Sequence, residues 1–147
     1  MDDTVHATAV AWADRACLIT GPSGSGKSSL AIEMIALGCT LICDDRVTLS
    51  RRDDSLIASS ARNITGLIEA RGIGLLTVPV QDPAAVAFCI DLSASTSTRL
   101  PPAQSRDLLG LAIPVMCSAY RPGLAAAVLL ALRHGIADPD RTGGGET

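Results

Sequence analysis

The sequence predicts an α/β domain, and three observations carry that prediction. A short apolar segment, residues 16–20, precedes a glycine-rich stretch, and a segment of helical composition, residues 28–37, follows that stretch. A second apolar segment, residues 40–43, comes soon after the glycine that ends the helix. Strand, loop, helix and strand in this order form a βαβ unit, which predicts a parallel pairing of the two strands.

Hydropathy patterning predicts the remaining elements. Residues 4–12 alternate with period two, which predicts one strand that ends in a turn at 13–15. A helix is expected over 124–133, because Pro122 lies near its start and Gly135 lies beyond its end. Further strands are expected at 47–49, 67–71, 74–80 and 85–92, with an edge strand at 113–115.

Polar segments set the expected limits of the domain. Residues 50–55 are predicted to form a turn, and residues 93–106 a mobile loop of low hydrophobicity. Residues 138–147 are predicted to be a flexible tail, so the domain is expected to cover residues 1–137.

Length and composition exclude several classes of protein. The 147 residues are enough for one domain, and 48% of them are apolar but only 2% are aromatic, so the core is expected to use small aliphatic side chains. This apolar content excludes a disordered chain. A net charge of −3 and the scarcity of aromatic residues argue against a dedicated nucleic-acid binder.

The cysteines and the N-terminus bear on the cellular compartment. Five cysteines without a C-x-x-C pair predict neither a disulfide framework nor a zinc site, but buried thiols in a reducing compartment. The acidic N-terminus does not resemble a signal peptide, and no apolar run reaches 18 residues, so we expect a cytoplasmic protein without membrane contact. The cysteines are Cys17, Cys39, Cys43, Cys89 and Cys117.

The glycine-rich stretch matches the phosphate-binding pattern G-x-x-x-x-G-K-[ST] in full. Its glycines let backbone N–H groups turn toward an anion, and the helix that follows adds its positive end. Lys27 suits the β- and γ-phosphates, and the Ser28 hydroxyl suits Mg²⁺. The pattern predicts that a nucleoside triphosphate binds to Gly21, Pro22, Ser23, Gly24, Ser25, Gly26, Lys27, Ser28 and Ser29.

Two adjacent carboxylates, Asp44 and Asp45, follow the strand at 40–43. This end of a strand lines the ligand crevice in open α/β sheets. Neighbouring side chains of a strand point to opposite faces, so we expect only one of the two carboxylates to face the γ-phosphate. A carboxylate there either holds the metal or accepts a proton from an incoming hydroxyl.

Three segments resemble the HPr kinase/phosphorylase family of bacteria. Residues 18–28 are similar to its nucleotide loop, and residues 41–47 to its strand that ends in paired aspartates. The discriminating segment is 68–76, which carries the family's signature at Glu69, Arg71, Gly72 and Gly74. The resemblance extends over residues 4–135 and concerns only the C-terminal catalytic domain of the longer members.

The resemblance implies a fold and a reaction. The fold is that of the HPr kinase C-terminal domain, similar to phosphoenolpyruvate carboxykinase, with a mixed sheet and flanking helices. The reaction is Mg²⁺- and ATP-dependent phosphorylation of a serine on HPr, the phosphocarrier protein of the sugar phosphotransferase system. The family also implies the reverse phosphorolysis, with inorganic phosphate as acceptor and pyrophosphate as product, and a homo-oligomer, a hexamer in the longer relatives.

The resemblance also assigns roles to individual residues. It implies that His6 is an active-site histidine ahead of the loop and that Lys27 is the loop lysine. It favours Asp45 as the proton acceptor from serine, with Asp44 close behind.

Three further positions take their roles from the same resemblance. Ser28 and Glu69 match the magnesium ligands, and Arg99 matches an arginine that closes on the phosphates. Here Arg121-Pro122-Gly123 is followed by Leu124-Ala125, where the family has Arg-Asn in a segment tied to dephosphorylation. This departure concerns the phosphorylase activity.

Two other functions stay open on the sequence alone. A small-metabolite kinase also fits a short chain with one phosphate loop, and so does a nucleotide-binding regulator without catalysis. The apolar stripe of the C-terminal helix suits either an interface or, as favoured here, ordinary core packing. Its residues are Leu124, Val128, Leu129 and Leu132.

Overall fold

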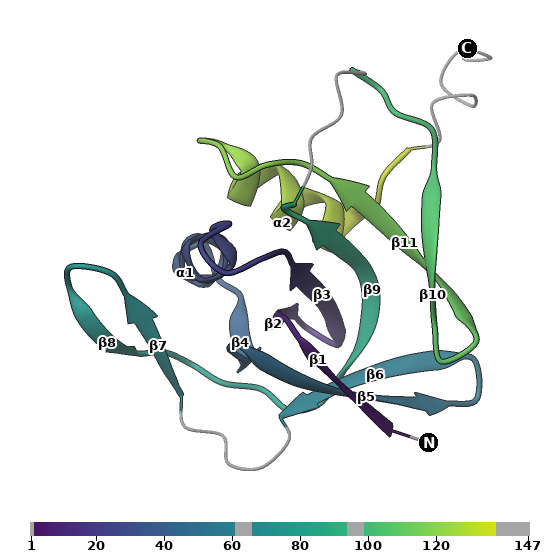
Figure 1. The fold of residues 1–147 in the computed structure, drawn as a ribbon, viewed down its shortest axis with the longest axis horizontal. Helices are drawn as coiled ribbons and strands as arrows, with labels where there is room; N and C mark the ends of the chain where they lie inside the picture. Colours follow the sequence, from purple (N-terminus) through teal and green to yellow (C-terminus); the bar gives the residue numbers. More distant parts are fainter. Residues whose placement is uncertain (1, 61–65, 94–98, 138–147) are drawn as a thin grey trace.

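The computed structural model describes residues 2–60, 66–93 and 99–137, and in this part of the chain a curled mixed sheet carries two helices on one face (Figure 1). The predicted tail at 138–147 lies outside the described residues. No helix in the described ranges is long and apolar enough to cross a membrane. The mixed α/β class predicted from the sequence is confirmed.

The elements follow one another in short steps along the chain. The helices are α1 (Lys27–Ala36) and α2 (Leu124–His134). The strands are β1 (Asp2–His6), β2 (Thr8–Trp12), β3 (Arg15–Thr20), β4 (Thr40–Cys43), β5 (Arg46–Arg52), β6 (Ser55–Ser60), β7 (Leu67–Ala70), β8 (Gly74–Thr77), β9 (Ala84–Asp91), β10 (Gln104–Leu108) and β11 (Leu111–Cys117).

The main sheet has the strand order β1-β5-β6-β9-β3-β2-β4, and β7 and β8 form a separate hairpin that projects beside α1 (Figure 1). One side of β9 is shared between two partners, because Ala84 and Ala85 pair with β6 whereas Cys89 to Asp91 pair with β11. The sheet therefore divides along β9, and the turn between β10 and β11 lies close to the β5–β6 hairpin, where the Arg51 guanidinium donates to the Leu109 carbonyl at 3.1 Å (Figure 1).

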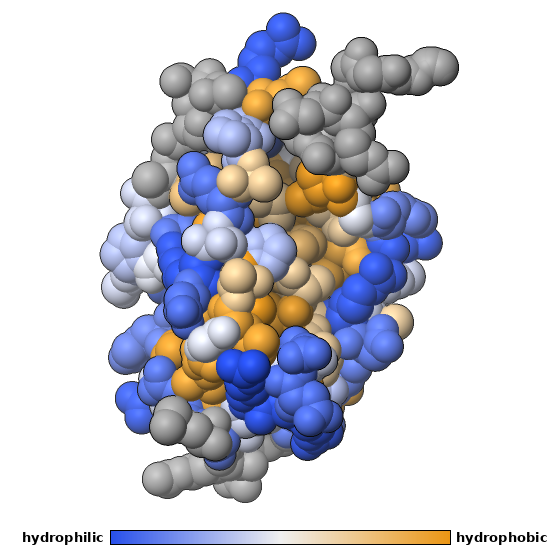
Figure 2. All heavy atoms as spheres, turned by 90° about the vertical axis from the view of Figure 1, so that its right-hand side faces the viewer, coloured by the Kyte–Doolittle hydropathy of each residue, from blue (hydrophilic) through white to orange (hydrophobic). Residues whose placement is uncertain are grey.

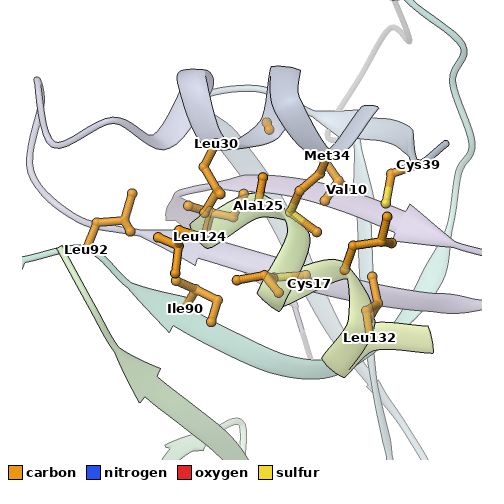
Figure 3. Close-up of a cluster of buried hydrophobic side chains, with 14 of the residues drawn as sticks. Val10, Cys17, Leu30, Met34, Cys39, Ile90, Leu92, Leu124, Ala125 and Leu132 are labelled. Carbon is orange, nitrogen blue, oxygen red and sulfur yellow. The ribbon is translucent and has the colours of Figure 1, made fainter. Parts of the chain in front are cut away.

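The helices cover one face of the sheet through a core of aliphatic side chains and one aromatic ring. Alternation along β2 and β3 directs Val10, Cys17 and Ile19 toward this face. Leu30 and Met34 of α1 meet Leu124, Ala125 and Leu132 of α2 over them (Figure 3). The apolar stripe of α2 is buried here, so the favoured interpretation of it as core packing is confirmed.

A second cluster fills the opposite face of the sheet. It takes the alternate residues of the same strands, such as Ala9 and Leu18, together with side chains of β5, β6 and β11. Seen from the side of β10 and β11, hydrophobic residues form a band across the middle of the surface between hydrophilic ones (Figure 2). Ile113 and Val115 of β11 belong to this cluster and are 7% and 8% exposed.

Two predictions about the first half of the chain need correction. Residues 4–12 form two strands, because the chain changes partners at Ala7: β1 pairs with β5, whereas β2 pairs with β3 and β4. The unit β3-α1-β4 is present, but its two strands do not pair. Strand β2 lies between them, antiparallel to both, and the parallel pairs are β3–β9 and β9–β11.

Three predictions about the chain after β4 also need correction. The turn expected at 50–55 narrows to Asp53 and Asp54, since β5 and β6 extend into it. The strand expected at the edge, β11, is not an edge strand, because it pairs with β10 on one side and with β9 on the other. Pro114 lies one residue before the pairing with β9 begins, so its missing N–H leaves the β9–β11 ladder intact. The loop expected at 93–106 ends earlier, because β10 starts at Gln104; residues 94–98 lie outside the described ranges.

The five cysteines are free thiols, and three of them are buried as predicted. Burial raises the pKa of the Cys17 thiol, and it raises the pKa of Cys39 and of Cys89 to about 11. These three thiols therefore stay protonated near neutral pH and serve as small core side chains. The remaining two, Cys43 and Cys117, are half-buried.

Candidate functional site

The glycine-rich loop joins the end of β3 to the start of α1. A turn within it is closed by the Ser25 N–H, which donates to the Pro22 carbonyl at 3.0 Å. Gly26 occupies the N-cap of α1 with φ of 105°, and a Cβ there would lie 2.9 Å from the Cβ of Tyr120. Only glycine combines this left-handed backbone with so close a neighbour.

Three polar features of the loop bear on anion binding. The Lys27 ammonium donates to the carbonyls of Gly21 at 2.7 Å and of Pro22 at 3.2 Å. The first turn of α1 holds no acidic residue, so the positive end of the helix is not neutralised locally. The Ser25 hydroxyl oxygen is buried and has no hydrogen-bond partner within the described residues. This combination suits an anion.

The loop residues differ in their exposure. The residues nearest to β3 and α1 are half-buried. The residues at the tip of the loop are exposed, and so is one residue in the first turn of α1. The half-buried residues are Gly21, Ser25, Gly26, Lys27 and Ser28, and the exposed ones are Pro22, Ser23, Gly24 and Ser29.

Asp44 lies beside the helix start and accepts hydrogen bonds from two hydroxyl groups. The Ser28 hydroxyl donates to its carboxylate at 3.0 Å and 3.3 Å, to Oδ1 and Oδ2. The Thr8 hydroxyl donates to Oδ1 at 2.8 Å. A hydroxyl and a carboxylate in contact at this position form a pair of hard oxygen donors, which is the ligand type that Mg²⁺ prefers.

Asp45 is placed differently from its neighbour. Its φ of 80° puts it in the left-handed region, and its backbone carbonyl accepts a hydrogen bond from the Ala7 N–H at 3.2 Å. Its carboxylate lies 3.7 Å from Nδ1 of His6, and both side chains are about three-quarters exposed, at 76% and 75%. The bend after β4 thus directs Asp44 toward α1 and leaves Asp45 open to a partner molecule. A non-glycine residue in this conformation is strained, as is common at functional sites.

The signature segment forms the β7–β8 hairpin, with Arg71 and Gly72 in its turn and Gly74 at the start of β8. Glu69 pairs with Leu75, and both are exposed, whereas their neighbours Ile68 and Leu76 pack against the helix-side core.

The structure does not bring Glu69 together with the aspartate pair. Throughout the described ranges, no three His, Cys, Asp or Glu side chains gather where they could hold a metal ion. Arg99 is exposed directly after residues 94–98, which lie outside the described part. Among the described residues, hydrogen bonds join Thr8 and Ser28 to Asp44, and His6 lies beside Asp45, whereas Glu69 and Arg99 form no hydrogen bond or ion pair with these residues.

Two features beside the loop were not predicted from the sequence. Thr8 is buried under α1 at a position of the β2 stripe that is otherwise apolar, and a polar residue in such a stripe was the available signal. Tyr120 lies against Gly26, and its hydroxyl donates to the Glu33 carboxylate of α1, which raises the pKa of Tyr120. No sequence spacing signals that second contact.

An ion pair at the end of β9 was also missed. Asp91 is in register with Thr20, the last residue of β3, and its carboxylate receives the Arg106 guanidinium at 2.8 Å. Burial disfavours the charged carboxylate, but hydrogen bonds from Ser93 and Arg106 outweigh this effect and lower the pKa of Asp91. Arg106 lay in the segment predicted to be a loop, so no partner was expected for it.

Comparison with known proteins identifies a family. The family model described as the HPr serine kinase C-terminal domain matches residues 1–130. The HPr kinase/phosphorylase of Bordetella pertussis is 34% identical over 140 residues, which cover 86% of this chain and 46% of that protein. The same enzyme of Clostridium tetani is 34% identical over 77% of this chain and 41% of its own length.

A solved structure gives the same match in three dimensions. The HPr(Ser) kinase/phosphatase of Coxiella burnetii superposes with a TM-score of 0.76 at 28% identity, and the match covers 89% of this chain and 88% of that one. The chain spans less than half the length of the curated relatives described above.

Proposed function

Because this chain belongs to the family of the HPr serine kinase C-terminal domain, we propose that it is an ATP-dependent kinase that phosphorylates a serine of HPr. The observation that carries the proposal is the contact of Ser28 with Asp44 at the start of α1, beside the loop lysine. A hydroxyl, a carboxylate and an ammonium group placed together at a helix N-terminus are the groups that phosphoryl transfer requires.

Nucleotide binding is assigned to the loop from Gly21 to Ser29. Its backbone N–H groups and the N-terminus of α1 would hold the phosphates. Lys27, whose ammonium donates to carbonyl oxygens of the loop in this structure, would turn to the transferred phosphoryl group. The unpartnered hydroxyl of Ser25 supports an anion in the same place.

Magnesium binding is assigned to Ser28, with the Asp44 carboxylate beside it. The oxygen donors present fit this ion. When bound, Mg²⁺ supplies charge neutralisation on the phosphates. Glu69, the second ligand expected from the family resemblance, lies on the outward face of the β7–β8 hairpin, and its role stays a prediction.

Proton transfer is assigned to Asp45. Its carboxylate is exposed and lies within reach of His6, so a serine hydroxyl of a docked protein can approach it. In the forward reaction the carboxylate accepts the serine proton while the serine oxygen attacks the γ-phosphorus. In the reverse reaction it returns the proton to the serine oxygen while inorganic phosphate attacks. Lys27 and Arg99 would stabilise the charge on the transferred group.

The segment after Arg121 favours the forward reaction. Leu124 and Ala125, which replace the polar pair of the family pattern, are 4% and 5% exposed in the core at the start of α2. They offer no polar side chain to inorganic phosphate. We expect serine phosphorylation to be faster than phosphorolysis under matched substrate concentrations.

The test combines the purified chain, Mg-ATP and HPr, with phosphate transfer followed by mass spectrometry. Asp45→Asn should lower transfer about a hundredfold or more, while ATP affinity stays unchanged. The matched control is Asp54→Asn, which removes an exposed carboxylate from the turn after β5. Absence of serine phosphate under every nucleotide condition would refute the kinase assignment, and ATP turnover with a small metabolite would replace it. Light scattering tests the expected homo-oligomer.

A further inference from the structure

Thr8 is the one polar residue that the described part of the chain buries completely. It begins β2, where alternation places it on the same face as Val10 and Trp12, under helix α1. Its cross-strand neighbour on β3 is Ile19, which is also fully buried. Burying a hydroxyl at such a position is unfavourable unless the hydroxyl has a partner, and valine would fit the same space without that cost.

The partner of Thr8 is the carboxylate of Asp44. The Thr8 hydroxyl donates to Oδ1 at 2.8 Å, and Oδ1 also accepts from the Ser28 hydroxyl at 3.0 Å. The two donors differ in their surroundings. Ser28 is half-buried at the loop, where its hydroxyl is free to turn toward a bound cation, whereas Thr8 is enclosed by the sheet and the helix. Thr8 is therefore the permanent donor to Asp44.

The geometry restricts what Asp44 can do. Thr8 is fixed by its strand, which lies between β3 and β4, and its β-branched side chain has few rotamers available. A short hydrogen bond from a fixed donor holds the carboxylate on the side of α1, in contact with Ser28. Without this bond, Asp44 would keep only a contact that a cation at Ser28 is able to displace.

We propose that Thr8 is a positioning residue of the nucleotide site, which holds the Asp44 carboxylate against Ser28 and thereby sets the affinity for the magnesium form of the nucleotide. The inference rests on the proposed function only in requiring that the loop bind a magnesium nucleotide. It requires nothing of HPr.

The experiment compares Thr8→Val, Thr8→Ser and Thr40→Val. Thr40 is a matched control, since it begins β4, at the end of the strand opposite Asp44, and its half-buried hydroxyl donates to the side-chain oxygen of Gln81 at 3.0 Å. Binding of ATP is titrated calorimetrically at increasing Mg²⁺ and again with a chelator. Thermal unfolding is recorded for each variant.

We expect Thr8→Val to raise the Mg²⁺ concentration at half-saturation about tenfold, the size of effect that one hydrogen bond to a charged acceptor produces. Its ATP affinity without metal should stay unchanged. Thr8→Ser keeps the hydroxyl but loses a buried methyl group, so it should retain the Mg²⁺ response with a lower unfolding temperature. Thr40→Val should leave the Mg²⁺ response unchanged.

An equal Mg²⁺ response in Thr8→Val and the wild type would overturn the proposal. So would an equal loss in Thr8→Val and Thr8→Ser, because packing would then account for the effect, and so would a wild-type affinity for ATP that does not depend on Mg²⁺. Binding of Mg-ATP without transfer to HPr would refute the proposed kinase but would still leave the comparison of the variants decisive for Thr8.

Discussion

The candidate site has two regions that differ in how their side chains are held. The phosphate-loop region covers residues 6–46, and the hairpin region covers residues 66–80 and 99–106. In the first, side chains from separate segments touch, as Thr8 and Ser28 do at Asp44. In the second, Glu69 and Arg99 are exposed, and within the described residues neither forms a hydrogen bond or an ion pair with these groups. A motif thus identifies candidate functional residues, whereas the folded sheet decides which of their side chains are held against one another.

The physical basis of the difference is the number of strands with which each segment pairs. Strands β2 and β3 are paired on both sides, so the turns at their ends have little freedom. The β7–β8 hairpin has two strands only, and it is held by one face, where Ile68 and Leu76 pack against the helix-side core. A two-stranded hairpin is marginally stable without such packing.

The largest expected effect on phosphate transfer is that of removing a cationic side chain, Lys27 in the phosphate-loop region or Arg99 in the hairpin region. Lys27→Ala should lower phosphate transfer about a thousandfold and weaken ATP binding, because the lysine is part of the loop before the nucleotide arrives. Arg99→Ala should lower transfer about a hundredfold and leave ATP affinity within about threefold, because Arg99 would meet the phosphates only on closure. Calorimetric titration and transfer to HPr measure the two quantities separately.

Arg52→Ala is the control for this pair, since it removes an exposed cation at the end of β5. An equal loss of ATP affinity in Lys27→Ala and Arg99→Ala would mean that both regions bind the nucleotide at once. The distinction between a placed and an unplaced region would then be wrong.

A second comparison concerns the two faces of the hairpin. Ile68→Ala should lower the free energy of unfolding by about 3 kcal/mol, since the side chain is 1% exposed and anchors β7 to the core. Leu75→Ala on the outward face should change it by less than about 0.5 kcal/mol, because that side chain is 68% exposed. Urea denaturation at neutral pH measures both values. A large loss in Leu75→Ala would mean that the outward face is covered in solution.

The phosphate-loop region was accessible from the sequence because its signals are local. The strand, glycine loop, helix and strand follow one another within residues 16–43, and each has its own composition. The position of Asp44 followed from the rule that strand ends line a crevice. The contact of Asp44 with Ser28 does not depend on the parallel pairing, which was wrong, because β2 lies between β3 and β4 without changing their common direction.

The rest was not accessible, because it depends on contacts between distant segments. The break between β1 and β2 results from a change of partner strand, which period-two alternation does not record. The strand β10 is polar and β6 is half polar, and both pair with a neighbour along their whole length, β6 with β5 and β10 with β11. The contact of Thr8 with Asp44 joins residues 36 positions apart, and only the folded sheet brings them together.

A third comparison tests the loop backbone itself. Gly26→Ala should lower the free energy of unfolding by about 2 kcal/mol or more, since it combines a φ of 105° with a clash against Tyr120 at 2.9 Å. Gly24→Ala meets no atom within 4 Å, so only the strain of its φ of 85° remains, and a loss of about 1 kcal/mol is expected. Thermal and urea unfolding rank the two variants. A ranking in the opposite order would show that Tyr120 does not lie over Gly26.

The smallest expected effect concerns the ion pair of Asp91 with Arg106, which ties the end of β9 to β10 and so joins the loop edge to the hairpin region. Arg106→Met keeps the apolar stem and removes the charge, and it should lower the free energy of unfolding by about 1 kcal/mol at pH 7, because the Arg106 side chain is 39% exposed.

The loss of stability in Arg106→Met is expected to depend on pH. The pKa of Asp91 is lowered in the folded state, so the pair stabilises the fold above the ordinary carboxyl value of 3.8. This stabilisation is lost as pH falls through the lowered pKa, where the carboxyl group is protonated and no longer attracts Arg106. The difference between wild type and Arg106→Met in urea denaturation should therefore shrink from pH 7 toward acid pH, whereas Arg52→Met should show no such trend. A difference that stays constant with pH would mean that Arg106 acts through packing, and the charge would not be what joins the two regions.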